Sequence, residues 1–181
     1  MLNGGVIPPF FYVIILKRGG KWCIVENNYT TTAMRMGEMM FVGKYQNSID
    51  AKNRMIIPSK YRDELGYSCV LTVGTDKCLY IYATADWENF AKKLLELSDF
   101  DETNRSLVRH YYANASTCEI DKQGRIMIPQ ELREFAGIEK DLVTLGVGNK
   151  IEVWSKTVLE SKGEIDPGKL AQERADRGVI I

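Results

Sequence analysis

Hydrophobic and polar residues follow the same order in two separate stretches of the chain. The stretch 49–58, IDAKNRMIIP, recurs as IDKQGRIMIP at 120–129. The match extends through later positions: Arg62 and Gly66 fall on Arg133 and Gly137, and LYIY at 79–82 falls on IEVW at 151–154 with one residue inserted. Chance similarity does not extend this far, so the sequence predicts an internal repeat of one structural unit.

Each copy of the repeat is predicted to form a strand, a tight loop, a second strand, a short helix and two further strands. Proline suits the first turn of a helix and glycine suits a left-handed stop. These residues predict two helices: 58–65, from Pro58 to before Gly66, and 129–136, from Pro129 to before Gly137. The runs that follow are predicted strands: 68–73, 78–82, 141–147 and 150–154.

Apolar residues at helical spacing lie between the two copies and predict two linking helices. The stripe around Trp87 predicts a helix at 85–97, and the stripe around Tyr111 predicts one at 102–115. The segment after Trp154 has mixed charges and no sustained apolar stripe, which predicts partial disorder in the tail.

The repeat and its linker predict the organisation of the chain. The expected fold class is α+β and rich in β-structure, with two half-barrels packed as one pseudo-symmetric barrel and a helical hairpin between them. The predicted divisions are an N-terminal extension at 1–39, a first repeat domain at 44–90, linking helices at 91–115, a second repeat domain at 116–159 and a tail at 160–181.

Residues 1–39 differ in pattern from the rest of the chain. The apolar run from Val6 to Leu16 contains two prolines and is too short to span a membrane. A secretory signal would require basic residues before the apolar run, and none precedes it here. The codons of Gly37 and Glu38 are purine-rich, like a ribosome-binding site, and two methionines follow. Translation is therefore predicted to begin at Met39 or Met40, in which case residues 1–39 have no function.

The charge and cysteine content narrow the classes of function. The chain has 24 basic and 24 acidic residues, so DNA binding would require a local basic patch. The four cysteines form no C-x-x-C pair, and His110 is the one histidine, which argues against a zinc site. A reduced cytosolic protein with structural cysteines and no metal or other cofactor is the simplest interpretation.

The repeated Asp-to-Arg loop is the candidate for chemistry. Asn53 and Gly124 tolerate positive φ and allow a sharp turn, and Asp50 and Asp121 can accept nearby backbone N–H groups to fix it. Arginine suits bidentate pairing with guanine, and lysine suits phosphate. Four such side chains are predicted at the tips of the two loops on one surface: Lys52, Arg54, Lys122 and Arg125.

Other interpretations of these residues stay open. Each Arg could form an ion pair with its own Asp that stabilises the loop and contacts nothing else. Two aspartates related by a repeat could also form the acid dyad of an enzyme, although the hydroxyl residue and glycine that follow such aspartates in aspartic proteases are missing. Other charged residues are predicted to be solvated: Lys60, Arg62, Arg109 and Arg133, with His110 on a helix surface.

The segment from Met40 to Tyr45, the stretch 49–58 and the second loop, Asp121 to Arg125, resemble the MraZ family of tandem SpoVT/AbrB-type modules. The resemblance extends from Met40 to about Trp154. It implies a bacterial transcriptional regulator, and no enzyme, that binds short tandem repeats in double-stranded DNA and represses its own division and cell-wall operon. Family members assemble as rings with their loops toward DNA, which implies a homo-oligomer that is cytoplasmic, nucleoid-associated and not bound to a membrane.

The family motif transfers to Asp50, Lys52 and Arg54 in the first copy and to Asp121 and Arg125 in the second. Two positions depart from it: Asn53 replaces the glycine usual before the first Arg, and Gln123 stands where the first copy has Lys52, with Lys122 one place earlier. Ring assembly would let a near-neutral subunit gain affinity by engaging several DNA repeats. The alternative is an antitoxin-like interaction module, although such modules are usually single-copy dimers with a toxin-binding tail.

Intact-mass measurement of the protein isolated from its own cells tests the predicted translation start. The expected mass is that of a chain beginning at Met39 or Met40. A product that begins at Met1 would contradict the prediction and would leave residues 1–39 as part of the functional protein.

Overall fold

The computed structural model of the protein describes residues 14–18, 21–25, 40–163 and 166–176. The chain divides into two compact units, Met1–Glu38 and Met39–Ile181, and each is described by itself. In the first unit, β1 (Ile14–Arg18) and β2 (Lys21–Val25) form an antiparallel hairpin. Most of the apolar run predicted at 6–16 and the junction before Met40 lie outside the described residues.

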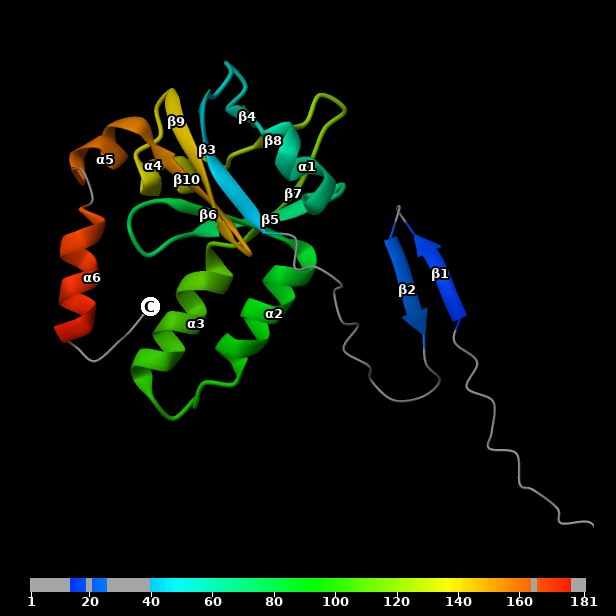
Figure 1. Ribbon diagram of the computed structural model, residues 1–181, viewed down its shortest axis with the longest axis horizontal. Helices are drawn as coiled ribbons and strands as arrows, with labels where there is room; N and C mark the ends of the chain where they lie inside the picture. Colours follow the sequence, from blue (N-terminus) through cyan, green and yellow to red (C-terminus); the bar gives the residue numbers. More distant parts are fainter. Residues whose placement is uncertain (1–13, 19–20, 26–39, 164–165, 177–181) are drawn as a thin grey trace, which may run out of the picture. The chain divides into compact units, whose positions relative to one another are not determined.

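The second unit contains both copies of the repeat, each with the predicted order of elements (Figure 1). The first copy consists of β3 (Phe41–Ser48), β4 (Arg54–Ile56), α1 (Ser59–Leu65), β5 (Ser68–Val73) and β6 (Leu79–Ala83). The second consists of β7 (Ser116–Glu119), β8 (Arg125–Met127), α4 (Gln130–Ala136), β9 (Asp141–Gly148) and β10 (Ile151–Ser155). The predicted short helices and the four strands after them are confirmed to within one residue at each end.

The short helices are bounded by the prolines and glycines that the sequence indicated. Pro58 and Pro129 are the N-cap residues, so each helix begins one residue later than predicted. Gly66 has φ of 72° and Gly137 has φ of 61°, a left-handed region that other residues adopt at a cost. The chain therefore leaves both helices abruptly and enters β5 and β9.

Strands of the two copies are interleaved in one six-stranded antiparallel sheet, in the order β3-β9-β10-β6-β5-β7. β3 of the first copy pairs with β9 of the second along its whole length, and β7 of the second copy pairs with β5 of the first. Each strand on one side of the sheet has its counterpart from the other copy at the same distance from the opposite edge: β3 corresponds to β7, β9 to β5 and β10 to β6. A pseudo-twofold axis therefore passes between β6 and β10. The α+β fold of two repeat-related half-barrels is confirmed. The domain boundaries 44–90 and 116–159 stay predictions, and strands from both ranges pair within one sheet.

A separate two-stranded ribbon joins β4 of the first copy to β8 of the second. Met55 lies directly opposite Ile126 in this ribbon, and the pseudo-twofold axis passes through that pair. Both side chains are buried in a core shared by the two copies. Apolar packing thus fixes the ribbon, and the loops that precede β4 and β8, to the six-stranded sheet.

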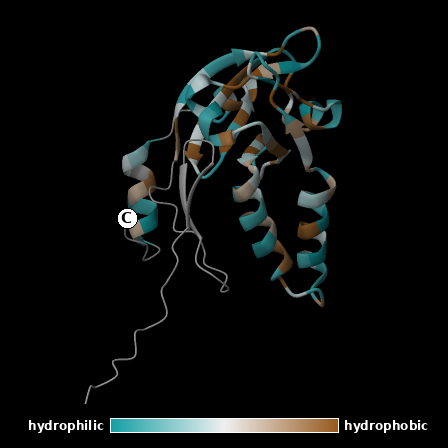
Figure 2. Cartoon of the chain, turned by 90° about the vertical axis from the view of Figure 1, so that its right-hand side faces the viewer, coloured by the Kyte–Doolittle hydropathy of each residue, from teal (hydrophilic) through white to brown (hydrophobic). Residues whose placement is uncertain are grey.

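The predicted linking helices are α2 (Thr84–Leu95) and α3 (Glu102–Ala113), each two residues shorter at its end than expected. Figures 1 and 2 show them side by side, extending away from the sheet. The Asp101 carboxylate caps α3 by accepting the N–H groups of Thr103 and Asn104. At the sheet, the Phe90 ring stacks on Tyr82 with centroids 5.5 Å apart, which anchors α2.

The tail contains two helices within the described residues, α5 (Lys156–Ser161) and α6 (Pro167–Asp176). The partial disorder of the tail stays a prediction; within the described residues, Val158 and Leu159 pack α5 against a cluster that contains Trp154. Residues 164–165 and 177–181 lie outside the description. Within the described ranges, no helix combines the length and the apolar character needed to cross a membrane.

Substitution of Gly146 tests the close approach of β9 to β3. A Cβ atom at this position would lie 2.5 Å from backbone atoms of Phe41 and Val42, so Gly146→Ala must displace a strand. We expect a loss of about 1–3 kcal/mol in the free energy of unfolding, measured by urea titration. Gly168→Ala in the exposed α6 is the control, with an unchanged or slightly raised midpoint. Equal midpoints for Gly146→Ala and the parent protein would contradict this strand packing.

Candidate nucleic-acid interface

The first Asp-to-Arg loop is organised by one carboxylate. Asp50 Oδ1 accepts the backbone N–H of Lys52 at 2.8 Å and that of Arg54 at 3.0 Å. The Asp50 carbonyl accepts the N–H of Asn53 at 2.9 Å, and Asn53 has φ of 59°. This left-handed residue closes the turn, so the chain enters β4 directly at Arg54.

The second loop has the same hydrogen bonds. Asp121 Oδ1 accepts the N–H of Gln123 and that of Arg125, both at 2.9 Å. The Asp121 carbonyl accepts the N–H of Gly124 at 2.8 Å, and Gly124 has φ of 76°. The two loops therefore have matching backbones although their tips differ in sequence.

Each arginine forms an ion pair with the aspartate of its own loop. Nε and Nη2 of Arg54 lie 2.8 and 2.6 Å from Asp50 Oδ2, and the same atoms of Arg125 lie 2.8 and 2.7 Å from Asp121 Oδ2. The Nη1 atom of each arginine lies 3.9 Å from the aspartate of the other loop. The structure thus brings the four side chains together in one charge-balanced, half-exposed quartet.

The arginines stabilise the charged form of both carboxylates. The side-chain hydrogen bond from Arg54, assisted by backbone N–H groups, lowers the pKa of Asp50 to about 2, and Arg125 does the same for Asp121. In an acid dyad, one carboxyl group must hold a proton at working pH, which requires a raised pKa. The hydrogen bonds of the quartet favour the charged form of both carboxylates over a shared proton, which argues against the acid-dyad interpretation.

The two loops are also bonded to each other's strands. The Ile57 N–H donates to the Gly124 carbonyl at 2.8 Å, and the Ile128 N–H donates to the Asn53 carbonyl at 3.0 Å. Because Ile57 and Ile128 are buried in the shared core, each turn is held in place by the other copy. The loops therefore form one rigid unit on one face of the protein.

Arg62 and Arg133 were predicted to be solvated, but both are only partly exposed and their Nε atoms are directed into the protein. Arg62 Nε donates to the Ile57 carbonyl at 2.8 Å, and its guanidinium fills the space that a Cβ atom on Gly124 would need. Arg133 is half-buried, and within the described residues its buried Nε has no hydrogen-bond partner. The recurrence of Arg62 as Arg133 in the repeat was the signal in the sequence that both positions are structurally constrained.

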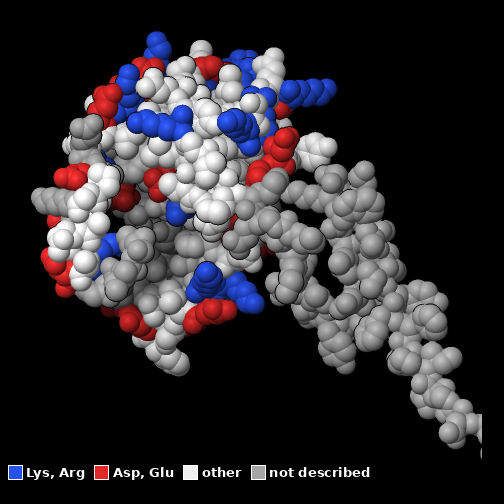
Figure 3. Space-filling view, in the orientation of Figure 1, with Lys and Arg blue, Asp and Glu red and all other residues white. Residues whose placement is uncertain are grey.

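The lysines occupy the exposed part of the loops. Lys52 and Lys122 are both exposed, and Lys60, at the start of α1, is exposed nearby in the sequence. Figure 3 shows Lys and Arg side chains over the end of the protein that bears β4 and the loops, with acidic side chains between them. The surface thus has lysines at its rim and arginines at its centre, an arrangement that suits contact with an anionic partner.

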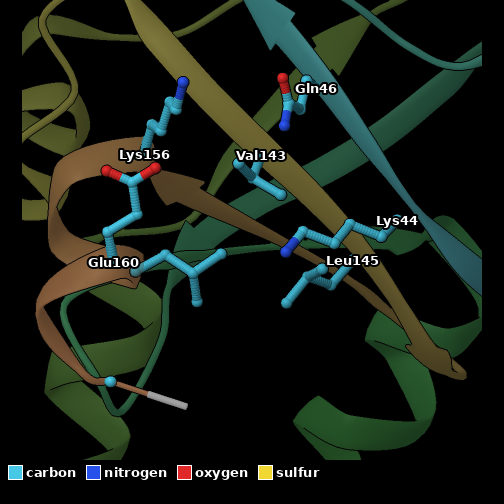
Figure 4. Close-up of a pocket in the computed structure, with 8 residues that line it drawn as sticks. Lys44, Gln46, Val143, Leu145, Lys156 and Glu160 are labelled. Carbon is cyan, nitrogen blue, oxygen red and sulfur yellow. The ribbon is translucent and has the colours of Figure 1, made fainter.

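Other features of the described residues lack the paired charged groups that the loops bring together. An open pocket between β3, β9 and α5 is lined by Lys44, Lys156, Glu160 and aliphatic side chains, and by none of the loop residues (Figure 4). Burial raises the pKa of Cys69 to about 12, so this thiol is a poor nucleophile. No three His, Cys, Asp or Glu side chains lie together as a metal site would need in the part of the chain described.

The fold and the loops define a class of protein: a tandem-repeat α+β protein with two Asp-to-Arg loops on one face. The model of the family described as "MraZ protein, putative antitoxin-like" matches residues 40–110 and 111–161. The chain belongs to the MraZ family, as the resemblance predicted.

Several relatives bear the name transcriptional regulator MraZ. The protein of Acetivibrio thermocellus is 51% identical over 122 residues, which are 67% of this chain and 85% of the relative. The protein of Lachnoclostridium phytofermentans is 46% identical over 140 residues, or 77% of this chain and 99% of the relative. That of Clostridium tetani is 43% identical over 142 residues, or 77% of this chain and all of the relative.

Acid titration of an Asp50→Asn, Asp121→Asn double variant tests the quartet. Both pKa values lie near 2 in the folded protein, below the ordinary value of 3.8. Their stabilising contribution is therefore complete above about pH 4 and is lost as the pH falls through about 2. We expect the variant to have a lower urea midpoint near neutral pH and a smaller loss of stability between pH 4 and 2.

Asp63→Asn, at an exposed position of α1, is the matched control and should follow the parent protein. Parallel loss of stability in the parent and the double variant over this pH range would show that the ion pairs do not form in solution.

Proposed function

We propose that the protein is a DNA-binding transcriptional regulator that represses its own division and cell-wall operon. In this proposal the two Asp-to-Arg loops bind short tandem repeats upstream of that operon. The main support is the rigid, paired presentation of both loops on one face, with exposed lysines at the tips. Relatives that share 39–51% of the matched residues bear the name transcriptional regulator.

The quartet prepares each arginine for a base contact. Arg54 and Arg125 use Nε and Nη2 to bind their aspartates, which fixes the plane of each guanidinium. A guanidinium has five N–H donors, so the edge formed by Nη1 and Nη2 retains donors for O6 and N7 of guanine. The intraloop ion pair and DNA recognition are thus compatible, because the first orients the side chain for the second.

Lys52 and Lys122 are proposed to contact phosphates. Both are exposed at the loop tips, and a lysine ammonium acts as a flexible point charge that suits phosphate more than a base edge. Gln123 stands where the first loop has Lys52, and Asn53 stands where the second has Gly124. We therefore expect the two loops to contact different parts of one DNA repeat.

Assembly into a ring is part of the proposal. The chain has balanced charges and each loop is small, so one subunit would bind DNA weakly. Several subunits on adjacent repeats would gain affinity because each later contact is effectively intramolecular. The protein would then act in the cytoplasm at the nucleoid. The alternative is the antitoxin-like interaction module, a possibility that the words of the family description also name.

Equilibrium binding to a duplex from the region immediately upstream of the gene tests this function. Arg54→Ala and Arg125→Ala should each weaken binding by about 1–3 kcal/mol and relax sequence preference, as loss of a guanine contact would. Lys52→Ala and Lys122→Ala should weaken binding to all sequences alike and reduce the salt slope by about one. Fluorescence anisotropy over a salt titration measures both effects.

Arg109→Ala, at an exposed position of α3, is the matched control and should bind as the parent protein does. Arg54→Lys separates charge from geometry, since it keeps the positive charge and loses the bidentate contact. Light scattering on the same samples should give a mass of several copies. Unchanged affinity in the double arginine variant would contradict the site, and a monomer at micromolar concentration would contradict the ring.

A further inference from the structure

The outer face of the β4–β8 ribbon combines charged and apolar side chains. Side chains alternate along each strand, so Met55 and Ile126 point into the core and their neighbours point outward. Ile56 is 49% exposed and Met127 is 61% exposed. They occupy the same position in the two copies of the repeat, so the pseudo-twofold axis relates them. The ribbon thus exposes an apolar residue at the same place twice.

The register of the ribbon places each apolar residue beside an arginine of the other copy. Met127 lies opposite Arg54, and Ile56 lies opposite Arg125. Side chains directly opposite one another on a sheet face have Cβ atoms about 4.5–5.5 Å apart. Each Arg–Asp ion pair therefore has an exposed apolar neighbour contributed by the other copy.

Packing of the protein itself does not require these two residues to be apolar. The ribbon is held to the core by its inward side chains, whereas Ile56 and Met127 leave about half or more of their surface in solvent. Outward positions of a solvated antiparallel ribbon are usually polar. Because they share one face with the two arginines, both residues would be covered by any ligand that the arginines bind.

We propose that Ile56 and Met127 contact the C5 methyl groups of thymines next to the guanines bound by Arg125 and Arg54. This inference rests on the proposed DNA-binding function and adds a determinant of its sequence specificity. The major groove admits a two-stranded ribbon, and the thymine methyl is the apolar group that a base edge presents there. A residue beside a guanine-binding arginine on the same ribbon face lies where the adjacent base would be.

The charges around the two residues favour DNA as the occupant of this face. Each loop has two basic side chains and one acidic side chain, and the acidic one is already paired with its own arginine. The remaining exposed charges at the tips, on Lys52 and Lys122, are positive. A polyanion with apolar groups on its groove floor complements this surface, whereas a second copy of the same positive face would repel it.

Ile56 and Met127 should differ in how strongly they prefer thymine over other bases. Isoleucine is branched at Cβ and stiff at χ1, so its methyl groups meet thymine in one geometry. Methionine is unbranched and adaptable, so it tolerates a displaced base. We therefore expect a stronger thymine preference on the side of the site that Ile56 contacts.

Replacement of thymine by uracil tests the proposal, because uracil lacks only the C5 methyl. The upstream duplex is prepared with thymine or with uracil in both strands, and affinity is measured for the full-length protein. We expect each lost methyl contact to weaken binding by roughly three- to fourfold. An Ile56→Ser, Met127→Ser double variant should bind the thymine duplex more weakly and should no longer distinguish the two duplexes.

Leu107→Ser, at another exposed apolar position on α3, is the control and should keep the parent ratio of the two affinities. Equal affinity of the parent protein for both duplexes, or an unchanged ratio in the double variant, would overturn the inference and leave the proposed function intact. A changed mass in light scattering with an unchanged ratio would instead identify this face as a contact between copies and would also overturn it. Failure of the parent protein to bind either duplex would overturn the proposed function itself.

Discussion

Exchange of strands between the two copies of the repeat is the constraint on which the rest of the structure depends. Neither copy can complete a sheet alone, because β3 requires β9 and β7 requires β5. The exchange brings β4 and β8 together on the pseudo-twofold axis and places both loops on one face. It also explains why the core is continuous, with Met55 and Ile126 buried at the point where the copies meet. Formation of the candidate site and formation of the fold are therefore the same event.

Charge compensation within the loops determines what this face can do. The aspartates neutralise the arginines, fix the orientation of each guanidinium and stabilise a partly exposed cluster of four charges. Lys52 and Lys122 remain as the exposed positive charges at the tips. The result is a rigid surface of modest charge, which in the proposed function favours recognition of a base edge over strong non-specific attraction to DNA.

The elements of each copy could be predicted from the sequence because local chemistry specifies them. Pro58 and Gly66 bound a helix, and Asp50 and Asn53 define a turn, whatever the remainder of the chain does. The exchange of strands could not be predicted, because an apolar strand has the same pattern whether its partner belongs to its own copy or to the other. Arg62 was interpreted as solvated because its contact with Gly124 arises only when the copies pack together. Packing of α5 likewise depends on a surface assembled from distant residues.

The pseudo-twofold axis relates two halves of a single polypeptide, so corresponding positions in the two halves can hold different residues. In a symmetric homodimer every substitution appears twice, so an asparagine at one hinge would force an asparagine at the other. Here Asn53 and Gly124 coexist, as do Lys52 and Gln123 at the tips and Ile56 and Met127 on the ribbon. Arg62 has a hydrogen-bond partner for its Nε, whereas Arg133, its counterpart, has none among the described residues. One half can thus keep the residues that folding requires while the other half accepts substitutions. Fusion of two copies into one chain makes such independent change possible.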